Sequence, residues 1–302
     1  LMTDMTMQRL EIESALRQAL QQQQFSLHYQ PQIDMFTDQL LGAEALVRWQ
    51  HPDKGLIRPD QFIPIAEESG LIVELGSWVL EEACRQYDQW RKRGWKLPKL
   101  SVNVSVKQLE RGNLPQQLLQ LQRKYDLPDN MLTLEITESV IMQKDYALTL
   151  LEEISECGVE LAIDDFGTGY SSLSYLQSAP FDKIKIDKAF IRGVTQKDNR
   201  NGAIISAIVR LAEALNMETT AEGIEAHDEL EAMRKLKVQQ IQGFIYAAAV
   251  SFDEVCEAMM SGEWVIEPSG PSKYRPDRRT VLRKVGLIHE DHRYEVTMRN
   301  LS

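Results

Sequence analysis

The sequence predicts an α/β fold in which strands and helices alternate and close into a (β/α)8 barrel with an antiparallel first strand. Eight short apolar runs are typical of strands, and helical stretches lie between most of them. Alternating strands and helices form parallel βαβ units, and eight units over roughly 240 residues are typical of a closed barrel. A doubly wound open sheet is the alternative that the same alternation leaves open.

The chain of 302 residues is expected to divide into three segments. Residues 1–24 form a leading linker helix, with apolar residues at helical spacing over 7–24. Residues 25–262 form the barrel. Residues 263–302 form a proline-rich linker and a slightly basic tail, with 8 Lys or Arg against 6 Asp or Glu. The first residues are not a natural start, so we expect a piece of a longer protein.

The strands of the barrel follow in order from the apolar runs. They are predicted at 25–32, 40–49, 100–106, 131–137, 159–166, 184–187, 219–224 and 240–247. Helices are predicted at 71–93, 114–125, 146–157, 199–215, 227–236 and 252–260. The link between the first two strands, 34–39, is too short for a helical crossover, so these two strands are expected to pair antiparallel.

Composition limits the class of partner and the compartment. The net charge is −11, so the chain repels DNA and anionic membranes, and an anionic ligand would need metal ions as a bridge. Three cysteines without a CxxC spacing indicate a reduced, cytoplasmic protein and exclude a cysteine zinc site. No apolar run approaches the length of a membrane segment, and no signal peptide is visible.

Two adjacent carboxylates, Asp164 and Asp165, end the fifth apolar run and precede Gly167 and Gly169. Carboxylates at the mouth of a buried strand repel each other and lose hydration, and divalent cations would remove that cost. The alternative is a loop in which acidic or hydroxyl side chains cap the helix that follows. This stretch alone does not decide between the two.

Polar residues on the other strands favour the metal interpretation. Because residues i and i+2 share a face of a strand, the sequence predicts six polar sets near strand ends. They are Gly42/Glu44/Leu46/Arg48, Asn103/Ser105, Glu135/Thr137, Lys183/Lys185/Asp187, Thr220/Glu222 and Gln240/Gln242. In a barrel these ends converge on the face where catalytic residues gather.

The convergent set is rich in oxygen ligands. It contains Glu44, Glu135, Asp164, Asp165 and Glu222, with Asn103 and Gln242. Oxygen ligands select hard cations such as Mg²⁺ or Mn²⁺, and five carboxylates exceed the need of one ion, which suggests a two-metal site. Such sites clamp the attacking and leaving oxygens of a phosphoryl displacement.

Lys185 is the cation on the inward face nearest to this set. It can orient or deprotonate a water bound to the metal, or neutralise a phosphate. The alternative is a structural ion pair with Asp187 or with the acidic cluster.

At these residues the chain resembles the EAL domain of bacterial cyclic di-GMP phosphodiesterases. Glu44-Ala45-Leu46 stands within EALVRW, and the resemblance extends over 25–262. It continues through YQP at 29–31, HPDKGLIRPDQFIPIAEESGLI at 51–72, NVS at 103–105, LEITES at 134–139, DDFGTGYSSL at 164–173, KIKID at 183–187, AEGIE at 221–225 and QGF at 242–244. So many spaced motifs together are far more specific than one short motif.

The resemblance implies a TIM-like barrel that hydrolyses cyclic di-GMP to linear pGpG with two Mg²⁺ or Mn²⁺ ions. It implies that Glu44, Asn103, Glu135 and Asp164 hold one ion and that Asp164, Asp165 and Glu222 hold the second. It also implies a homodimer, and the leading helix makes an upstream GGDEF or sensor domain plausible.

The resemblance assigns further roles by residue. Catalysis is assigned to Lys185, Glu44 and Gln242. Substrate binding is assigned to Gln30, Leu46, Arg48, Asp187 and Glu225, of which Glu225 is also a candidate for supporting or binding a metal. Glu138 is expected to anchor the loop after the Asp164–Asp165 pair and to support dimerisation.

Two stretches depart from the EAL pattern or extend it. Ala247, Ala248 and Ala249 replace the family's usual polar and proline residues after QGF, which puts the guanine-facing rim in doubt. In the tail, Arg279 and Arg283 resemble the RxxxR motif, and 300–302 the start of the NxSxxG motif, of a PilZ cyclic di-GMP receptor domain. The alternative for the tail is a solvated basic segment without a fold.

Three functional hypotheses follow from the sequence. The first is the metal-dependent phosphodiesterase. The second is a cyclic di-GMP receptor without strong catalysis. The third is a scaffold that binds neither metal nor nucleotide.

Overall fold

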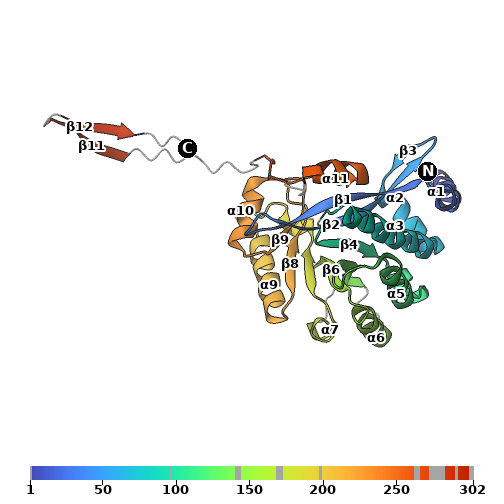
Figure 1. Cartoon of the computed structure of the whole chain (residues 1–302). Coiled ribbons are helices and arrows are strands. Elements are labelled where there is room, and N and C mark those ends of the chain that lie inside the picture. Colours follow the sequence, from blue (N-terminus) through green and yellow to red (C-terminus); the bar gives the residue numbers. More distant parts are fainter. Residues whose placement is uncertain are drawn as a thin grey trace.

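A computed structural model gives the architecture of the chain. It describes residues 2–95, 97–139, 144–167, 173–196, 199–261, 266–271, 283–289 and 292–298. Eight strands form the barrel wall (Figure 1): β1 Phe25–Asp34, β2 Leu40–His51, β4 Lys99–Val104, β5 Leu132–Thr137, β6 Glu160–Phe166, β7 Lys183–Ile186, β8 Glu218–Ala221 and β9 Gln240–Ile241. All eight predicted strands are therefore confirmed.

The sheet closes on itself through β1. Strands β2, β4, β5, β6, β7, β8 and β9 pair parallel in that order, and β1 pairs antiparallel with both β2 and β9. Phe25 opposes Trp49 and Gln30 opposes Glu44 in the β1–β2 register. The antiparallel first strand is thus confirmed, and the open doubly wound sheet is wrong.

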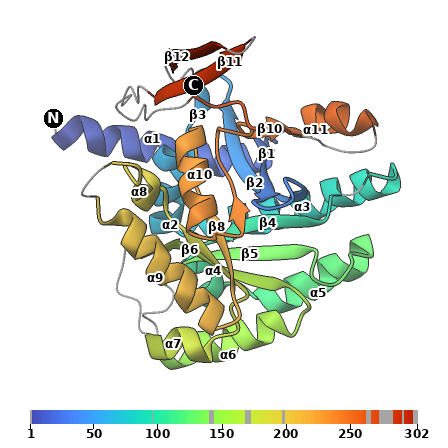
Figure 2. The same cartoon turned by 90° about the vertical axis from the view of Figure 1, so that its left-hand side faces the viewer.

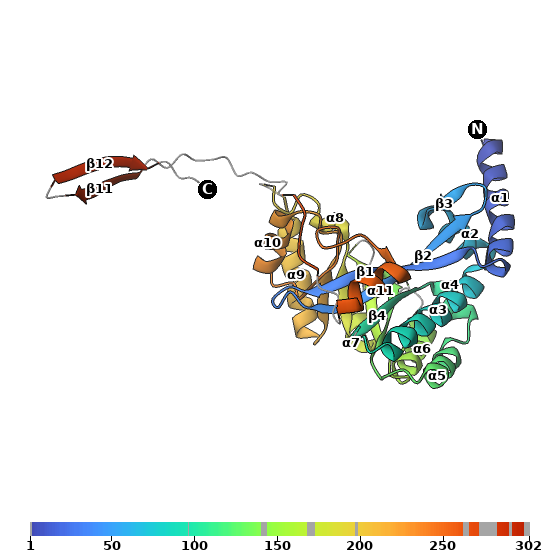
Figure 3. The same cartoon turned by 45° about the horizontal axis from the view of Figure 1, so that its top comes forward.

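Helices cover the outside of the barrel (Figure 2). They are α1 Met2–Gln21, α2 Pro59–Ser69, α3 Ile72–Lys92, α4 Val106–Arg111, α5 Leu114–Tyr125, α6 Lys144–Ser155, α7 Leu173–Ser178, α8 Lys188–Ile191, α9 Asn201–Ala214, α10 His227–Lys235 and α11 Phe252–Ala258. The leading helix α1 packs beside α2 (Figure 3), so it is part of the folded body. Its Leu16 is fully buried, as the helical spacing of apolar residues predicts.

The sequence missed several elements, most of them short. Strands β3 Gly55–Ile57 and β10 Val250–Ser251 extend the edges of the sheet, and helices α2, α4, α7 and α8 were also not predicted. Helix α2 begins at Pro59 and contains Pro64. In a sequence, proline inside a stretch usually indicates the end of a helix, so this helix was not expected. The predicted last strand is too long, since β9 ends at Ile241. Just beyond it, the backbone of Gly243 lies so close to Ile224 that a Cβ on Gly243 would be 2.1 Å from the Ile224 carbonyl oxygen.

The tail contains a hairpin of its own. Strands β11 Arg283–His289 and β12 His292–Met298 pair antiparallel, with His289 opposite His292. Arg279 and residues 300–302, which carry most of the PilZ resemblance, lie outside the described residues. Within the described residues, every helix is too short or too polar to span a bilayer.

Candidate active site

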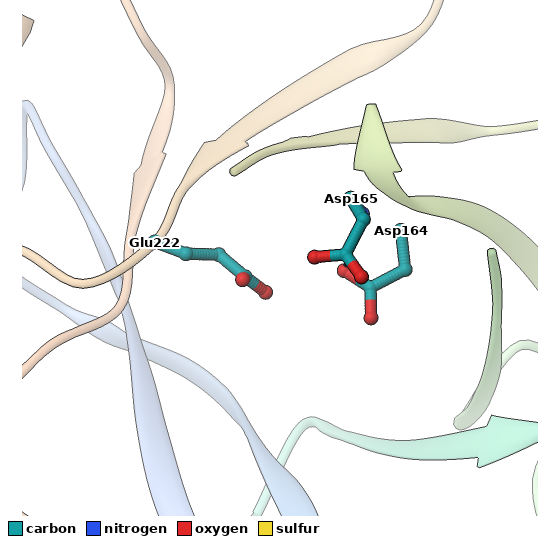
Figure 4. Close-up of side chains that lie close together, drawn as sticks. All are labelled: Asp164, Asp165 and Glu222. Atoms are coloured by element: carbon teal, nitrogen blue, oxygen red, sulfur yellow. The ribbon is translucent and has the colours of Figure 1, made fainter. Parts of the chain in front are cut away.

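Three carboxylates meet at the carboxyl ends of the barrel strands. Figure 4 shows Asp164 and Asp165 from the end of β6 and Glu222 from the segment after β8, with their side chains turned toward one another. One oxygen from each of the three lies within 4.8 Å of the others. Oxygen atoms at such separations suit one divalent cation, so these residues fit the predicted metal site.

A bulge explains how two consecutive residues reach one site. Neighbouring residues of a regular strand point to opposite faces, which would separate Asp164 from Asp165. The β6–β7 register shifts between Ile163 and Phe166, and Asp165 adopts a left-handed backbone conformation with φ of 53°. The amide of Asp165 also donates to Oδ1 of Asp164 over 3.0 Å. The bulge therefore directs both carboxylates to the site.

Lys185 lies at the centre of the acidic cluster. Its side chain is 1% exposed. Its Nζ lies 2.5 Å from Glu222, 3.3 Å from Asp164 and 3.6 Å from Glu44, and it forms a further ion pair with Glu135. Lys185 therefore forms the ion pair with the acidic cluster that the sequence left open as its structural role. The amine occupies the position of a counter-ion among four carboxylates.

The burial and crowding of these charges shift their pKa values. Burial alone would lower the pKa of Lys185, but the surrounding carboxylates, Asp164 first, raise it well above the usual value. Burial raises the pKa of Glu222 to about 8, with Asp164 and Glu44 adding to the rise and Lys185 opposing it. Burial and the neighbouring Asp164 and Asp187 raise the pKa of Asp165 to about 6. These carboxyl groups therefore hold their protons to higher pH than usual, because one lysine does not balance all of them in their ionised form.

Glu44 is held by two amides. Asn103 Nδ2 donates to one of its carboxylate oxygens over 2.5 Å, and Gln242 Nε2 donates to the other over 2.5 Å. Gln242 also donates to Gln30 Oε1 over 3.1 Å. The structure thus brings together Gln30 from β1, Glu44 from β2, Asn103 from β4 and Gln242 from the segment after β9, which the sequence assigned to the site.

Glu138 contacts the glycine turn, as expected of a loop anchor. The amide of Gly167 donates to Glu138 Oε2 over 3.1 Å, and the Glu138 side chain is buried. Gly167 has a φ of 94°, and a Cβ there would lie 2.9 Å from the ring of Phe190. Glycine is therefore required on both conformational and steric grounds. The loop at 168–172 lies outside the described residues.

Two hollows open beside Glu44 and Asn103. One of about 340 Å³ contacts the acidic cluster, and its lining includes Gln30, Glu44, Leu46, Asp164, Glu222, Glu225 and Gln242. The other, of about 250 Å³, is largely apolar and is lined by Leu46, Arg48, Pro59, Ile63, Asn103 and Val104, among others. Leu46 belongs to both hollows.

The first hollow also contains residues that the sequence did not single out. Lys188, Arg192 and Phe244 line it, and Phe244 is 64% exposed. Lys188 begins α8 and Arg192 directly follows its last residue; this helix is too short to be recognised by periodicity, which is why both were missed. Two cations at the rim of an acidic hollow favour an anionic ligand.

Asp187 and Glu225 lie near the acidic cluster but are not part of the group of three carboxylates that fits a cation, among the residues described. The Asp187 carboxylate caps α8 by accepting from the amide of Ala189 over 2.8 Å. The backbone of Glu225 donates to Glu229 Oε2 over 3.0 Å.

The alanine rim is fixed through its backbone. Gln30 Nε2 donates to the carbonyl oxygen of Ala247 over 3.1 Å, and His28 Nδ1 lies 3.4 Å from that of Ala249. The methyl side chains contribute no polar group. The contacts from β1 therefore hold the backbone of this segment and do not involve its alanine side chains.

Comparisons with known proteins identify the family of the chain. Residues 13–249 match the EAL domain family. The chain is 43% identical over 239 residues to the Pseudomonas aeruginosa protein named bifunctional diguanylate cyclase/cyclic di-GMP phosphodiesterase MucR, covering 79% of this chain and 35% of that protein. It is 40% identical over 248 residues to the Escherichia coli cyclic di-GMP phosphodiesterase PdeR, covering 81% and 37%.

A solved structure shows the same fold. The structure titled PaMucR phosphodiesterase, c-di-GMP complex, superposes with a TM-score of 0.77 at 41% identity, over 81% of this chain and 99% of that one. The chain spans about a third of the length of the curated relatives it matches. On its sequence, its barrel and its cluster of oxygen ligands, the chain belongs to the EAL domain family.

Proposed function

We propose that this chain is a metal-dependent phosphodiesterase that hydrolyses cyclic di-GMP to linear pGpG. The observation that carries the proposal is the group of carboxylate oxygens of Asp164, Asp165 and Glu222 within 4.8 Å of one another, beside a hollow that can receive a ligand. The names of MucR and PdeR, and the cyclic di-GMP complex of the MucR domain, support the same substrate.

The set of ligands is proposed to hold two Mg²⁺ or Mn²⁺ ions. Glu44, Asn103, Glu135 and Asp164 would hold one, and Asp164, Asp165 and Glu222 the other. When bound, the ions polarise the phosphoryl group and activate the attacking water. The carboxylates converge from β2, β5, β6 and the segment after β8, which supports a scissile phosphate held at these strand ends.

Lys185 is proposed to act as a cation rather than as a base. The pKa of its amine is raised by the surrounding carboxylates, so the amine is charged near neutral pH. A charged amine at the strand ends stabilises negative charge that develops on the phosphoryl oxygens. Gln242 donates to Glu44 and keeps that carboxylate turned toward Asn103.

The two hollows suggest how the dinucleotide lies. Cyclic di-GMP carries two purines, and Leu46 forms part of the lining of both hollows. We infer that one base enters the apolar hollow beside Leu46 and Arg48 and that the other lies toward Gln30 and Glu225. Asp187 is proposed to contribute to substrate binding. It lies beside Asp165 and raises the pKa of that carboxyl group.

Further proposals reach beyond the barrel. A homodimer and a PilZ-like tail rest on the resemblance alone, an upstream GGDEF or sensor domain is proposed from the leading helix, and a cytoplasmic location is proposed from the cysteine usage. A catalytically weak receptor is the second candidate function, favoured by the alanine rim at Ala247–Ala249.

Incubation of the protein with cyclic di-GMP and Mg²⁺, followed by chromatography for pGpG, tests the proposed function. Product formation that EDTA stops would support the phosphodiesterase. Binding of cyclic di-GMP in Ca²⁺ without product in Mg²⁺ or Mn²⁺ would instead support the receptor, and absence of both binding and turnover would leave only the scaffold.

A further inference from the structure

Gln32 lies beneath the acidic cluster, in the interior of the barrel. It is 2% exposed and shares a face of β1 with Gln30. Gln30 opposes Glu44 in the β1–β2 register, whereas Gln32 opposes Gly42. Gln32 is therefore one layer deeper than the candidate metal ligands.

The amide of Gln32 connects three strands. Its Nε2 donates to Gln242 Oε1 over 3.1 Å and to Glu135 Oε1 over 3.4 Å, and its Oε1 accepts from Ser101 Oγ over 3.4 Å. A primary amide has two N–H donors, so both donors of Gln32 have partners. Neither partner can move without breaking a buried hydrogen bond.

These contacts determine the orientation of Gln242. Its oxygen faces the donor on Gln32, so its nitrogen must face Glu44 and Gln30. A reversed amide would bring its oxygen against the Glu44 carboxylate, which is repulsive. Gln32 thus supports, together with Glu44 and Gln30, the orientation in which Gln242 donates to a candidate metal ligand.

Gln32 also orients Glu135. It binds Oε1 of that carboxylate, while Lys185 pairs with Oε2. One oxygen is thereby held toward the floor of the barrel, and the other is presented to the cluster. Hydrogen bonds of this kind are the means by which proteins orient the residues that hold a metal.

We propose that Gln32 is a positioning residue, which orients Glu135 directly and Glu44 through Gln242 so that the carboxylates present their oxygens to metal ions. The proposal rests on the proposed function, because it assumes that these carboxylates bind metal. Loss of such an orienting partner typically lowers metal affinity or activity by about 10- to 100-fold.

Gln32→Met removes the amide while keeping a side chain of similar length. Gln240→Met is the matched control. Gln240 is 5% exposed on β9, donates to Glu218 over 2.6 Å and accepts from Thr220 over 3.1 Å, and neither partner is a candidate metal ligand. Both variants lose buried hydrogen bonds, but only Gln32→Met loses hydrogen bonds to Glu135 and Gln242.

The test is a Mn²⁺ titration of the metal-free full chain, followed by electron paramagnetic resonance of the unbound ion. We expect Gln32→Met to bind Mn²⁺ at least tenfold more weakly than the unmodified protein and Gln240→Met to bind within threefold of it. In assays with saturating Mg²⁺, kcat of Gln32→Met should fall while KM changes little. Equal Mn²⁺ affinity in Gln32→Met and the unmodified protein would overturn the proposal.

The titration separates this proposal from the proposed function. Unmodified protein that binds Mn²⁺ but yields no pGpG would refute the phosphodiesterase and still permit the comparison. If the methionine variants do not fold, Gln32→Asn and Gln240→Asn replace them, because each keeps an amide and shortens its reach by one methylene. Gln32→Asn should then bind Mn²⁺ more weakly than Gln240→Asn, and equal affinities would refute the positioning role.

Discussion

The Nζ of Lys185 lies 2.5 Å from a carboxylate oxygen of Glu222, within the cluster that we propose binds the metal ions. The same amine pairs with three other carboxylates, so it partly neutralises the site in the absence of metal. Metal entry would then add positive charge to a site that already contains a cation. Such an arrangement keeps the carboxylates close together before any ion binds.

Lys185→Met should destabilise the metal-free protein, because it leaves several buried carboxylates without their cation. Loss of one partner from a buried ion pair typically costs about 3–5 kcal/mol in the free energy of unfolding. Denaturant unfolding in EDTA measures this loss. Turnover in Mg²⁺ should also fall by about 100-fold or more, because a cation at the reacting phosphate is removed.

Lys183→Met is the control for this prediction. Lys183 lies on the same strand and is 3% exposed, but its ion-pair partner is Glu218, at 3.7 Å, outside the cluster. We expect its kcat in Mg²⁺ to remain within a few-fold of the unmodified protein. A Lys185→Met protein as stable in EDTA as the unmodified chain would contradict the counter-ion role.

The stability of the metal-free protein should decrease as pH rises. The pKa of Glu222 is about 8 in the folded protein, against about 4.3 in an unfolded chain. The folded state therefore binds more protons between these values, so the contribution of Glu222 is full below pH about 4 and is lost as pH rises through about 8. Unfolding in EDTA at pH 6, 7, 8 and 9 would test this expectation.

Metal affinity should change in the opposite direction. Glu222 must lose its proton to bind a cation, so Mg²⁺ should bind more tightly at pH 9 than at pH 7. Calorimetric titrations in buffers of different ionisation enthalpy would measure the protons released. Glu222→Gln should abolish most of that proton release. If this variant releases as many protons as the unmodified protein, the protons come from another group.

Glu138→Ala should reduce turnover while leaving the barrel folded. The mutation removes the acceptor of the Gly167 amide, beside the Asp164–Asp165 pair. We expect kcat to fall by about tenfold or more, because positioning of the carboxylates is lost, with a smaller effect on the melting temperature. Glu152→Ala, at an exposed position of α6, is the control that should behave as the unmodified protein does.

Arg192→Ala should weaken substrate binding. Arg192 lines the hollow beside the cluster and presents a positive charge to a dianionic dinucleotide. KM should rise by several-fold and the rise should shrink at high salt, because the attraction is screened. Arg210→Ala removes a charge from an exposed position of α9 and serves as the matched control. Equal KM values for the two variants would exclude a role for Arg192.

The periodicity of the sequence was sufficient to predict the barrel and its strands. The short link at 34–39 predicted the antiparallel pairing of β1 with β2, which the register Gln30 to Glu44 confirms. Six polar sets at strand ends predicted where the site lies, because the ends of barrel strands converge. The strand pattern and the short link are local features of the sequence. The convergence of the strand ends follows from them once the strands form a barrel.

Other features depend on tertiary contacts and could not be predicted. Gln32 reads as one more polar residue in a strand, and only the closed barrel brings it to Glu135 and Gln242. The alternation of residues along a strand does not reveal the bulge at Asp165. That bulge nevertheless explains why both aspartates face the site. Helix α8, which begins at Lys188 and ends just before Arg192, is shorter than the shortest pattern that periodicity detects.

The rate of pGpG formation by the unmodified protein and by Asp164→Asn, at saturating Mg²⁺, tests the central claim most directly. We propose that Asp164 belongs to both ion sites, so the account predicts steady hydrolysis of cyclic di-GMP by the unmodified protein and a loss of about 1,000-fold or more in Asp164→Asn. Circular dichroism would establish that the variant is folded. A folded Asp164→Asn protein that hydrolyses cyclic di-GMP within tenfold of the unmodified rate would contradict the account.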